Sequence, residues 1–110
     1  MSSDKRIALV TGSSSGIGRA EAVALAKAGY DVVINYSKSE REARSTAGAC
    51  EKLGAKTLVL QCDVADEASV IAMMDAITET FGRIDVLCNN AGAYLRAVAS
   101  RRLVPSMPSV

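Results

Sequence analysis

Residues 11–18 read Thr-Gly-Ser-Ser-Ser-Gly-Ile-Gly and directly follow the apolar run Ile-Ala-Leu-Val. This order predicts a buried strand that ends in a turn containing Gly12, Gly16 and Gly18, and then a helix. Such a junction presents backbone N–H groups at the positive end of a helix dipole, which favours a phosphate. Glycine is needed because a Cβ atom would hold a diphosphate away from the backbone. The pattern therefore predicts nucleotide binding, although an ordinary glycine-rich loop also fits these residues.

The elements that would position this turn alternate between strand and helix along the chain. Alternation of this kind predicts a parallel sheet with crossover helices, which is an α/β architecture. The expected strands cover about residues 6–10, 32–35, 57–62 and 84–88, and the expected helices about 17–28, 40–53 and 67–81.

Local signals mark the ends and faces of these helices. Ser39 and Glu42 match a capping box at the start of the second helix, and Asp66 is a good N-cap for the third. The third helix carries an apolar stripe that only a helical period fits. Its Met73 and Met74 could form a soft ligand-binding face, but packing against the sheet is the preferred interpretation. The stripe comprises Val70, Met73, Met74, Ile77 and Phe81.

Composition excludes several classes of function. A chain of 110 residues is one domain at most, and its net charge of +1 gives no reason to expect a nucleic acid or an anionic membrane as a partner. No apolar run approaches the roughly 18 residues of a membrane span, and the N-terminus lacks a signal peptide, so we expect a cytoplasmic protein. Three cysteines without Cys-x-x-Cys spacing, and no histidine, argue against a disulfide framework or a metal site.

Two further polar segments follow predicted strands. Asp63 and Val64 come after the third strand, where a carboxylate could accept a hydrogen bond from an adenine amino group, although a simple turn aspartate also fits. The sequence Asn-Asn-Ala-Gly at 89–92 follows the fourth strand. Its amides can fix neighbouring strand ends, and Ala-Gly leaves room for a ribose. Because the carboxyl ends of parallel strands meet at one edge, we expect a cleft there.

Taken in this order, the glycine turn, Asp-Val and Asn-Asn-Ala-Gly resemble the short-chain dehydrogenase/reductase family. The stretch at 81–92, Phe-Gly-Arg-Ile-Asp-Val-Leu-Cys-Asn-Asn-Ala-Gly, is especially similar to the 3-oxoacyl-carrier-protein reductase-like members. The resemblance covers about residues 5–92. It implies an incomplete Rossmann-type doubly wound sheet of about four strands in the order 3-2-1-4. It also implies a dinucleotide-binding half-domain at 1–92, followed by a poorly specified tail at 93–110.

The resemblance also assigns cofactor contacts residue by residue. They fall into a pyrophosphate group, a nicotinamide contact, an adenine pair and a group that lines the cofactor cleft. In that order they are Gly12, Ser14, Ser15, Gly16 and Gly18; Ile17; Asp63 and Val64; and Asn89, Ala91 and Gly92.

The residues after the second strand bear on the choice of cofactor. An acid there would bind the ribose of NAD and repel a 2′-phosphate, but Tyr36 takes its place. Ser37 and Lys38 offer a hydroxyl and an ammonium to a phosphate, so NADP is favoured over NAD. Against this, Lys38 also fits a solvated face, and Ser15 stands where NADP-preferring relatives often have a basic residue.

The family's catalytic residues have no counterpart in this chain. Hydride transfer there uses a tyrosine followed four residues later by a lysine that lowers its pKa. Tyr30, Tyr36 and Tyr94 are followed at that spacing by isoleucine, glutamate and valine. Residues 93–110 contain three arginines, no acid and two prolines, a composition that looks like a truncation or a shifted reading frame.

Three functional hypotheses remain open at this point. The chain is the NADP(H)-binding portion of an oxidoreductase that acts on a carbonyl or alcohol and is inactive alone. Alternatively, it is a non-catalytic nucleotide-binding or non-functional fragment. A methyltransferase using S-adenosylmethionine would share the glycine turn, but Asn-Asn-Ala-Gly argues against it. In either of the first two cases the outer edge of the fourth strand is open to self-association.

Overall fold

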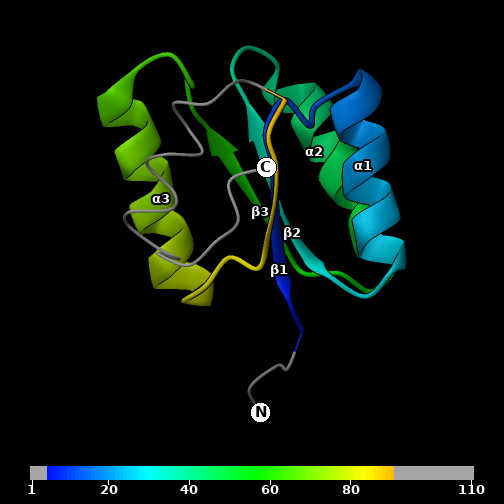
Figure 1. The fold of residues 1–110 in the computed structure, drawn as a ribbon. Coiled ribbons are helices and arrows are strands. Elements are labelled where there is room, and N and C mark those ends of the chain that lie inside the picture. The colour runs from blue at the N-terminus through cyan, green and yellow to red at the C-terminus, as the bar shows by residue number, and fades with distance from the viewer. Residues whose placement is uncertain (1–4, 91–110) are drawn as a thin grey trace.

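A computed structural model describes residues 5–90 of the chain, which form one parallel sheet and three helices (Figure 1). The chain alternates strictly between strand and helix, as the sequence predicts. The elements are β1 (Ile7–Val10), α1 (Gly16–Lys27), β2 (Asp31–Tyr36), α2 (Glu40–Glu51), β3 (Thr57–Gln61), α3 (Glu67–Phe81) and β4 (Val86–Cys88).

The four strands are ordered β3-β2-β1-β4, and every pair is parallel. Leu9, at the centre of β1, is aligned with Val33 of β2 on one side and with Leu87 of β4 on the other. The predicted strand order is therefore confirmed, and the switch in direction falls between β1 and β4. A crevice at this position is where doubly wound sheets bind their ligands.

Helices cover the two faces of the sheet unequally (Figure 1). On one face, α1 and α2 pack through alanines against Val10, Val32 and Ile34. On the other face, α3 is the one helix among residues 5–90 that packs against Leu9 and Val33. Met73 and Met74 are both buried in that second cluster, so their interpretation as packing residues is confirmed.

The ends of the elements differ from the predicted ones by a few residues. Ser39 caps α2 as predicted, since its side chain accepts a hydrogen bond from the backbone of Glu42. Asp66 occupies the N-cap position of α3, but its side chain makes no capping bond. Instead the preceding turn is held by Asp63, whose carboxylate accepts from the N–H of Ala65 and whose carbonyl accepts from the N–H of Asp66.

Two carboxylates accept hydrogen bonds that hold neighbouring strands together at their amino ends. The buried Asp31 accepts from the backbone N–H of Lys56 at 2.9 Å. Asp85 accepts from the N–H of Ile7 at 2.8 Å and pairs with Arg83. Burial alone raises the pKa of Asp85, but the hydrogen bonds from Arg83 and Ile7 and the nearby arginine charges outweigh it and lower the pKa below 3.8. These bonds fix strand register and hence align the opposite, carboxyl ends.

No helix within residues 5–90 is long and apolar enough to cross a membrane. Ala91, Gly92 and the predicted tail at 93–110 lie outside the described residues.

Candidate functional site

The turn between β1 and α1 has a backbone that only glycine adopts readily. Gly12 and Gly16 both have φ of +62°, in the left-handed region. Gly18 is required for a different reason, because a Cβ atom there would collide with the carbonyl oxygen of Gly12 and lie 2.7 Å from its carbonyl carbon. A Cβ built on Gly16 has no other atom within 4 Å. The turn is therefore tightly packed where Gly18 faces Gly12, and it is open on the side of Gly16.

A buried side chain that the sequence-based site omits, Ser13, holds this turn onto β2. Its hydroxyl donates to the carbonyl of Val10 at 2.7 Å and accepts from the N–H of Asn35 at 3.0 Å. The Ser13 N–H donates to the Asn35 carbonyl, and the Gly12 N–H donates to Asn35 Oδ1, both at 3.0 Å. The N–H groups of Gly12 and Ser13 are thus used within the fold, so they cannot serve a ligand.

The next N–H groups along the chain differ from these two. No acceptor within residues 5–90 pairs with the N–H groups of Ser14, Ser15, Gly16, Ile17 or Gly18. Ser15 is the N-cap of α1, but its side chain makes no capping bond, in contrast to Ser39 at the start of α2. As far as residues 5–90 are concerned, the positive end of α1 therefore carries several unpaired donors, of which those of Ser15, Gly16 and Ile17 belong to exposed residues, and such an arrangement binds anions.

The carboxyl end of β4 is bonded directly to the start of the same turn. The N–H of Asn90 donates to Thr11 Oγ1 at 2.8 Å, and its side-chain Nδ2 donates to the Thr11 carbonyl at 2.9 Å. The Thr11 hydroxyl also lies 3.4 Å from Asn89 Oδ1. The amides of the Asn-Asn pair thus fix neighbouring strand ends, as the sequence predicts. Ile17, 76 % exposed, stands at the start of α1 on the same edge.

The predicted adenosine contacts follow β2 and β3 at this edge. Tyr36 is half-buried, whereas Ser37 and Lys38 are exposed in the loop that leads to α2. The Ser37 carbonyl accepts from Gln61 Nε2 at 3.1 Å, which ties this loop to the end of β3. Asp63 is exposed, but one of its carboxylate oxygens accepts a hydrogen bond from the N–H of Ala65. Val64 beside it is half-buried.

Comparison with known proteins identifies the family to which the chain belongs. Residues 6–105 match the family model described as short chain dehydrogenase, which is most of the chain. The chain belongs to the short-chain dehydrogenase/reductase family. The matched stretch continues past Gly92, into the segment that we expected to depart from the family. Members of this family bind NAD or NADP.

Individual relatives agree with this assignment. The chain is 44 % identical over 86 residues to the short-chain dehydrogenase/reductase homolog YusS of Bacillus subtilis, covering 78 % of this chain and 79 % of that protein. It is 44 % identical over 85 residues to the 3-oxoacyl-acyl-carrier-protein reductase FabG of Staphylococcus aureus, covering 77 % of this chain and 35 % of the reductase. The crystal structure of acetoin dehydrogenase from Enterobacter cloacae matches with a TM-score of 0.75 and 36 % identity, covering 81 % and 35 % of the two chains.

The match thus spans about a third of the reductase and of the acetoin dehydrogenase. Within the 110 residues of this short-chain dehydrogenase, no tyrosine is followed four positions later by lysine.

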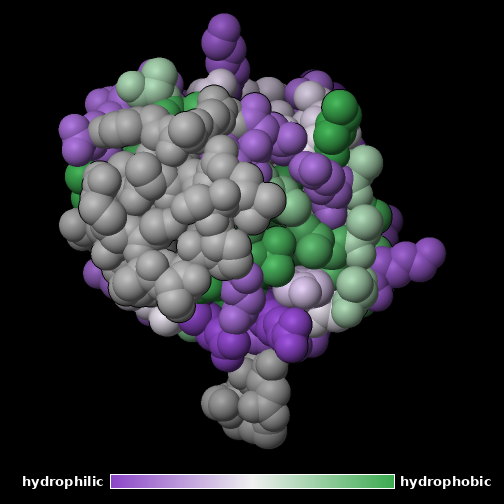
Figure 2. Space-filling model, in the orientation of Figure 1, coloured by the Kyte–Doolittle hydropathy of each residue, from purple (hydrophilic) through white to green (hydrophobic). Residues whose placement is uncertain are grey.

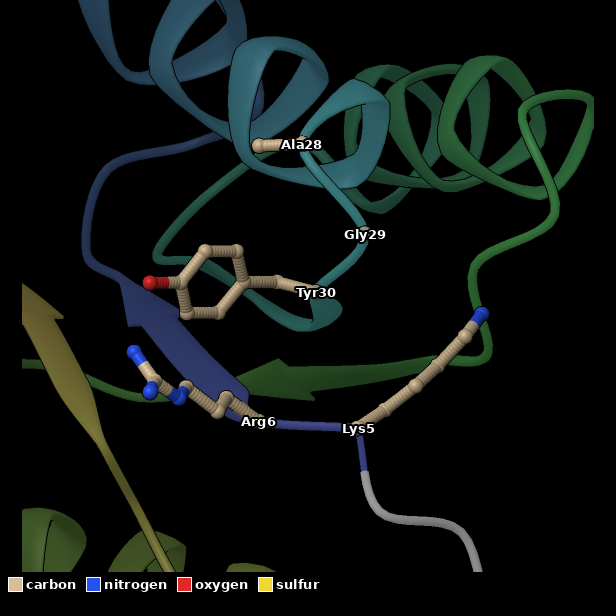
Figure 3. Close-up of a pocket in the computed structure, with 5 residues that line it drawn as sticks. All are labelled: Lys5, Arg6, Ala28, Gly29 and Tyr30. Atoms are coloured by element: carbon tan, nitrogen blue, oxygen red, sulfur yellow. The ribbon is translucent and has the colours of Figure 1, made fainter.

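A hollow of about 470 Å³ lies at the end of the sheet opposite to the glycine turn (Figure 3). It is lined by Lys5 and Arg6 before β1 and by Ala28, Gly29 and Tyr30 after α1. In Figure 3 the side chains of Arg6 and Tyr30 extend to the same side, while Lys5 extends the other way, toward the Gly54 carbonyl that it contacts at 2.8 Å. This hollow is at the amino ends of the strands, away from the unpaired N–H groups of the turn.

Proposed function

We propose that this chain is the NADP(H)-binding portion of a short-chain oxidoreductase that acts on a carbonyl or alcohol. The observation that carries the proposal is the row of N–H groups from Ser14 to Gly18, which find no acceptor in the described part of the chain, at a helix start whose N-cap side chain makes no capping bond. A diphosphate bound there would accept hydrogen bonds from these N–H groups, and its negative charge would be attracted to the positive end of the helix dipole. The open surface above Gly16 leaves room for it.

Topology then assigns a direction to the two halves of the dinucleotide. The diphosphate lies over β1, and the sheet order puts β2 and β3 on one side of it and β4 on the other. We infer that the adenosine half extends over β2 and β3, toward Asp63 and Val64. The nicotinamide half, which supplies hydride chemistry when bound, extends over β4, toward Ile17 and Asn89 and onward to Ala91 and Gly92.

NADP is the preferred cofactor in this proposal. β2 ends with Tyr36, and Ser37 and Lys38 follow in the loop, with no carboxylate where a ribose diol would be bound. The hydroxyl of Ser37 and the ammonium of Lys38 are both exposed at that loop and suit a 2′-phosphate. Replacing Tyr36, which stands where that acid would lie, with aspartate is expected to reverse the preference toward NAD.

The chain alone is proposed to bind cofactor without turning over substrate. The reason is that the 110 residues contain no tyrosine followed four positions later by lysine. The relatives named above are a reductase of 3-oxoacyl groups and a dehydrogenase of acetoin, which supports a carbonyl or alcohol as the substrate of the whole enzyme. A non-catalytic fragment is the alternative that the same absence allows.

Titration calorimetry and thermal melting test this proposal. NADPH should bind and raise the melting temperature more than NADH does, and S-adenosylmethionine should do neither. Ser15→Glu places a negative charge at the turn without removing a bond, so it should weaken NADPH binding at least tenfold. Ala72→Glu, on the exposed side of α3, is the matched control and should bind normally. Loss of binding in both variants, or in neither, would contradict the proposal.

An assay of NADPH oxidation with an acetoacetyl thioester addresses inactivity. We expect a rate indistinguishable from the no-protein background. Turnover by the purified chain would show that catalytic residues other than the tyrosine–lysine pair are present.

Two further expectations concern partners and location. Among residues 5–90, β4 pairs on one side only, and Val86, Leu87 and Cys88 are half-buried. Apolar surface is also visible between α1 and the grey residues in Figure 2. We propose that the open edge of β4 mediates self-association, which sedimentation over a concentration range would detect.

We propose the cytoplasm as location, because all three cysteines are free thiols.

A further inference from the structure

Glu21 lies on the side of the turn opposite to the predicted adenosine contacts. It follows Ile17 by one helical turn of α1, and its carboxylate oxygen accepts from Asn90 Nδ2 at 2.9 Å. The same Nδ2 donates to the Thr11 carbonyl at 2.9 Å, so both hydrogens of this amide have acceptors. The carboxylate is therefore held at the carboxyl end of β4 by a group that is itself anchored to β1.

The negative charge of Glu21 acts on the end of β4. Burial is the main reason that the pKa of the Cys88 thiol is raised, and the charge of Glu21 raises it further. The neighbouring cation on α1 is directed elsewhere, since Arg19 donates to Ser45 and Thr46 of α2. The negative charge of Glu21 therefore reaches the end of β4, and the guanidinium of Arg19 is not hydrogen-bonded to it.

Oxidation state changes the charge of one half of the cofactor only. The oxidised nicotinamide ring is a cation, whereas the reduced ring is neutral. The diphosphate and the adenosine half carry the same charge in both forms, so their repulsion from Glu21 cancels when the two forms are compared. A fixed carboxylate on the nicotinamide side therefore favours the oxidised form.

We propose that Glu21 is a specificity-determining residue that makes this site favour oxidised over reduced nicotinamide cofactor. The inference rests on the proposed dinucleotide site and on the nicotinamide half extending over β4. Glu21 is partly exposed, so its effect is that of a solvent-screened charge pair, about two- to fivefold in relative affinity.

Titration calorimetry with NADP⁺ and NADPH tests the proposal on the purified full chain. Glu21→Gln keeps an oxygen acceptor for Asn90 and removes the charge. The ratio of the dissociation constant for NADP⁺ to that for NADPH should rise about two- to fivefold. Glu79→Gln, on the exposed end of α3, removes an equal charge far from the turn and should leave the ratio unchanged.

The outcomes separate this inference from the proposed function. If Glu21→Gln binds both forms with the wild-type ratio, the role of Glu21 is refuted while the dinucleotide site stands. If the wild-type chain binds neither form, the proposed function itself fails. Should the variant not fold, the wild-type ratio is measured against NaCl concentration. The ratio should rise as the NaCl concentration approaches about 1 M, because the Debye length is then only about 3 Å and the charge of Glu21 is screened from the nicotinamide ring. A ratio that does not change with salt would overturn the inference.

Discussion

Replacement of Gly18 by alanine should damage both the stability of the fold and the phosphate-binding turn. A Cβ atom at this buried position collides with the carbonyl oxygen of Gly12 and lies 2.7 Å from its carbonyl carbon and 2.9 Å from Ser13 Cα. All three are backbone atoms, which cannot rotate away as a flexible side chain can. The first turn of α1 must therefore separate from the glycine turn.

The expected magnitude follows from two opposing effects. Alanine in a helix is about 1 kcal/mol more favourable than glycine. Overpacking of a rigid site costs about 1–3 kcal/mol and more when backbone must move. We therefore expect Gly18→Ala to lower the free energy of unfolding by about 2 kcal/mol. With a urea m value of about 1 kcal/mol/M for a chain of this size, the midpoint should fall by about 2 M.

Gly48→Ala provides the matched control. Gly48 lies within α2, and a Cβ atom built there has no other atom within 4 Å. The same substitution should therefore raise the free energy of unfolding by about 0.5–1 kcal/mol. Urea titrations followed by circular dichroism measure both variants. Equal stability of Gly18→Ala and the wild type would refute the packing argument, as would a loss of stability in Gly48→Ala.

Three other results are expected from the contacts above. Ser13→Ala removes the hydroxyl bonds to the Val10 carbonyl and from the Asn35 N–H and should cost about 1–3 kcal/mol of unfolding free energy by urea titration, whereas Ser15→Ala should change it by less than about 0.5 kcal/mol. Because the pKa of Asp85 is lowered in the fold, its stabilisation is present above pH of about 4 and is lost as pH falls further. The Asp85→Asn variant should therefore lose less unfolding free energy than the wild type when the solution is acidified. An equal loss in the variant and the wild type would contradict this prediction. Burial raises the pKa of all three cysteine thiols above 9.0, so alkylation should be slow at pH 7 and accelerate above pH 9.

Much of the fold could be predicted because periodic patterns agree with local end signals. The apolar stripe that contains Met73 and Met74 has one possible period, and Ser39 with Glu42 marks a helix start. The glycine spacing likewise determines the turn, since each of its glycines is required by backbone angle or by close packing.

The supporting contacts of the site could not be predicted in the same way. Asn35 appears in the sequence as the last residue of a strand, yet its carboxamide and backbone use the N–H groups of Gly12 and Ser13. Asn90 and Glu21 are far apart in the sequence and meet because β4 lies beside β1. Such pairings depend on three-dimensional register, which no local pattern encodes. A polar residue at a strand end opposite a glycine turn was the available signal for Asn35.

An amide-resolved NMR titration with NADPH tests the central claim most directly. If the turn binds the diphosphate, the N–H resonances of Ser14 to Gly18 should shift most, while those of Gly12 and Ser13, which bond to Asn35, should shift less. Resonances of Arg6 and Tyr30 at the opposite hollow should stay in place. Shifts that gather at Arg6 and Tyr30, with the turn unaffected at saturating NADPH, would contradict the account.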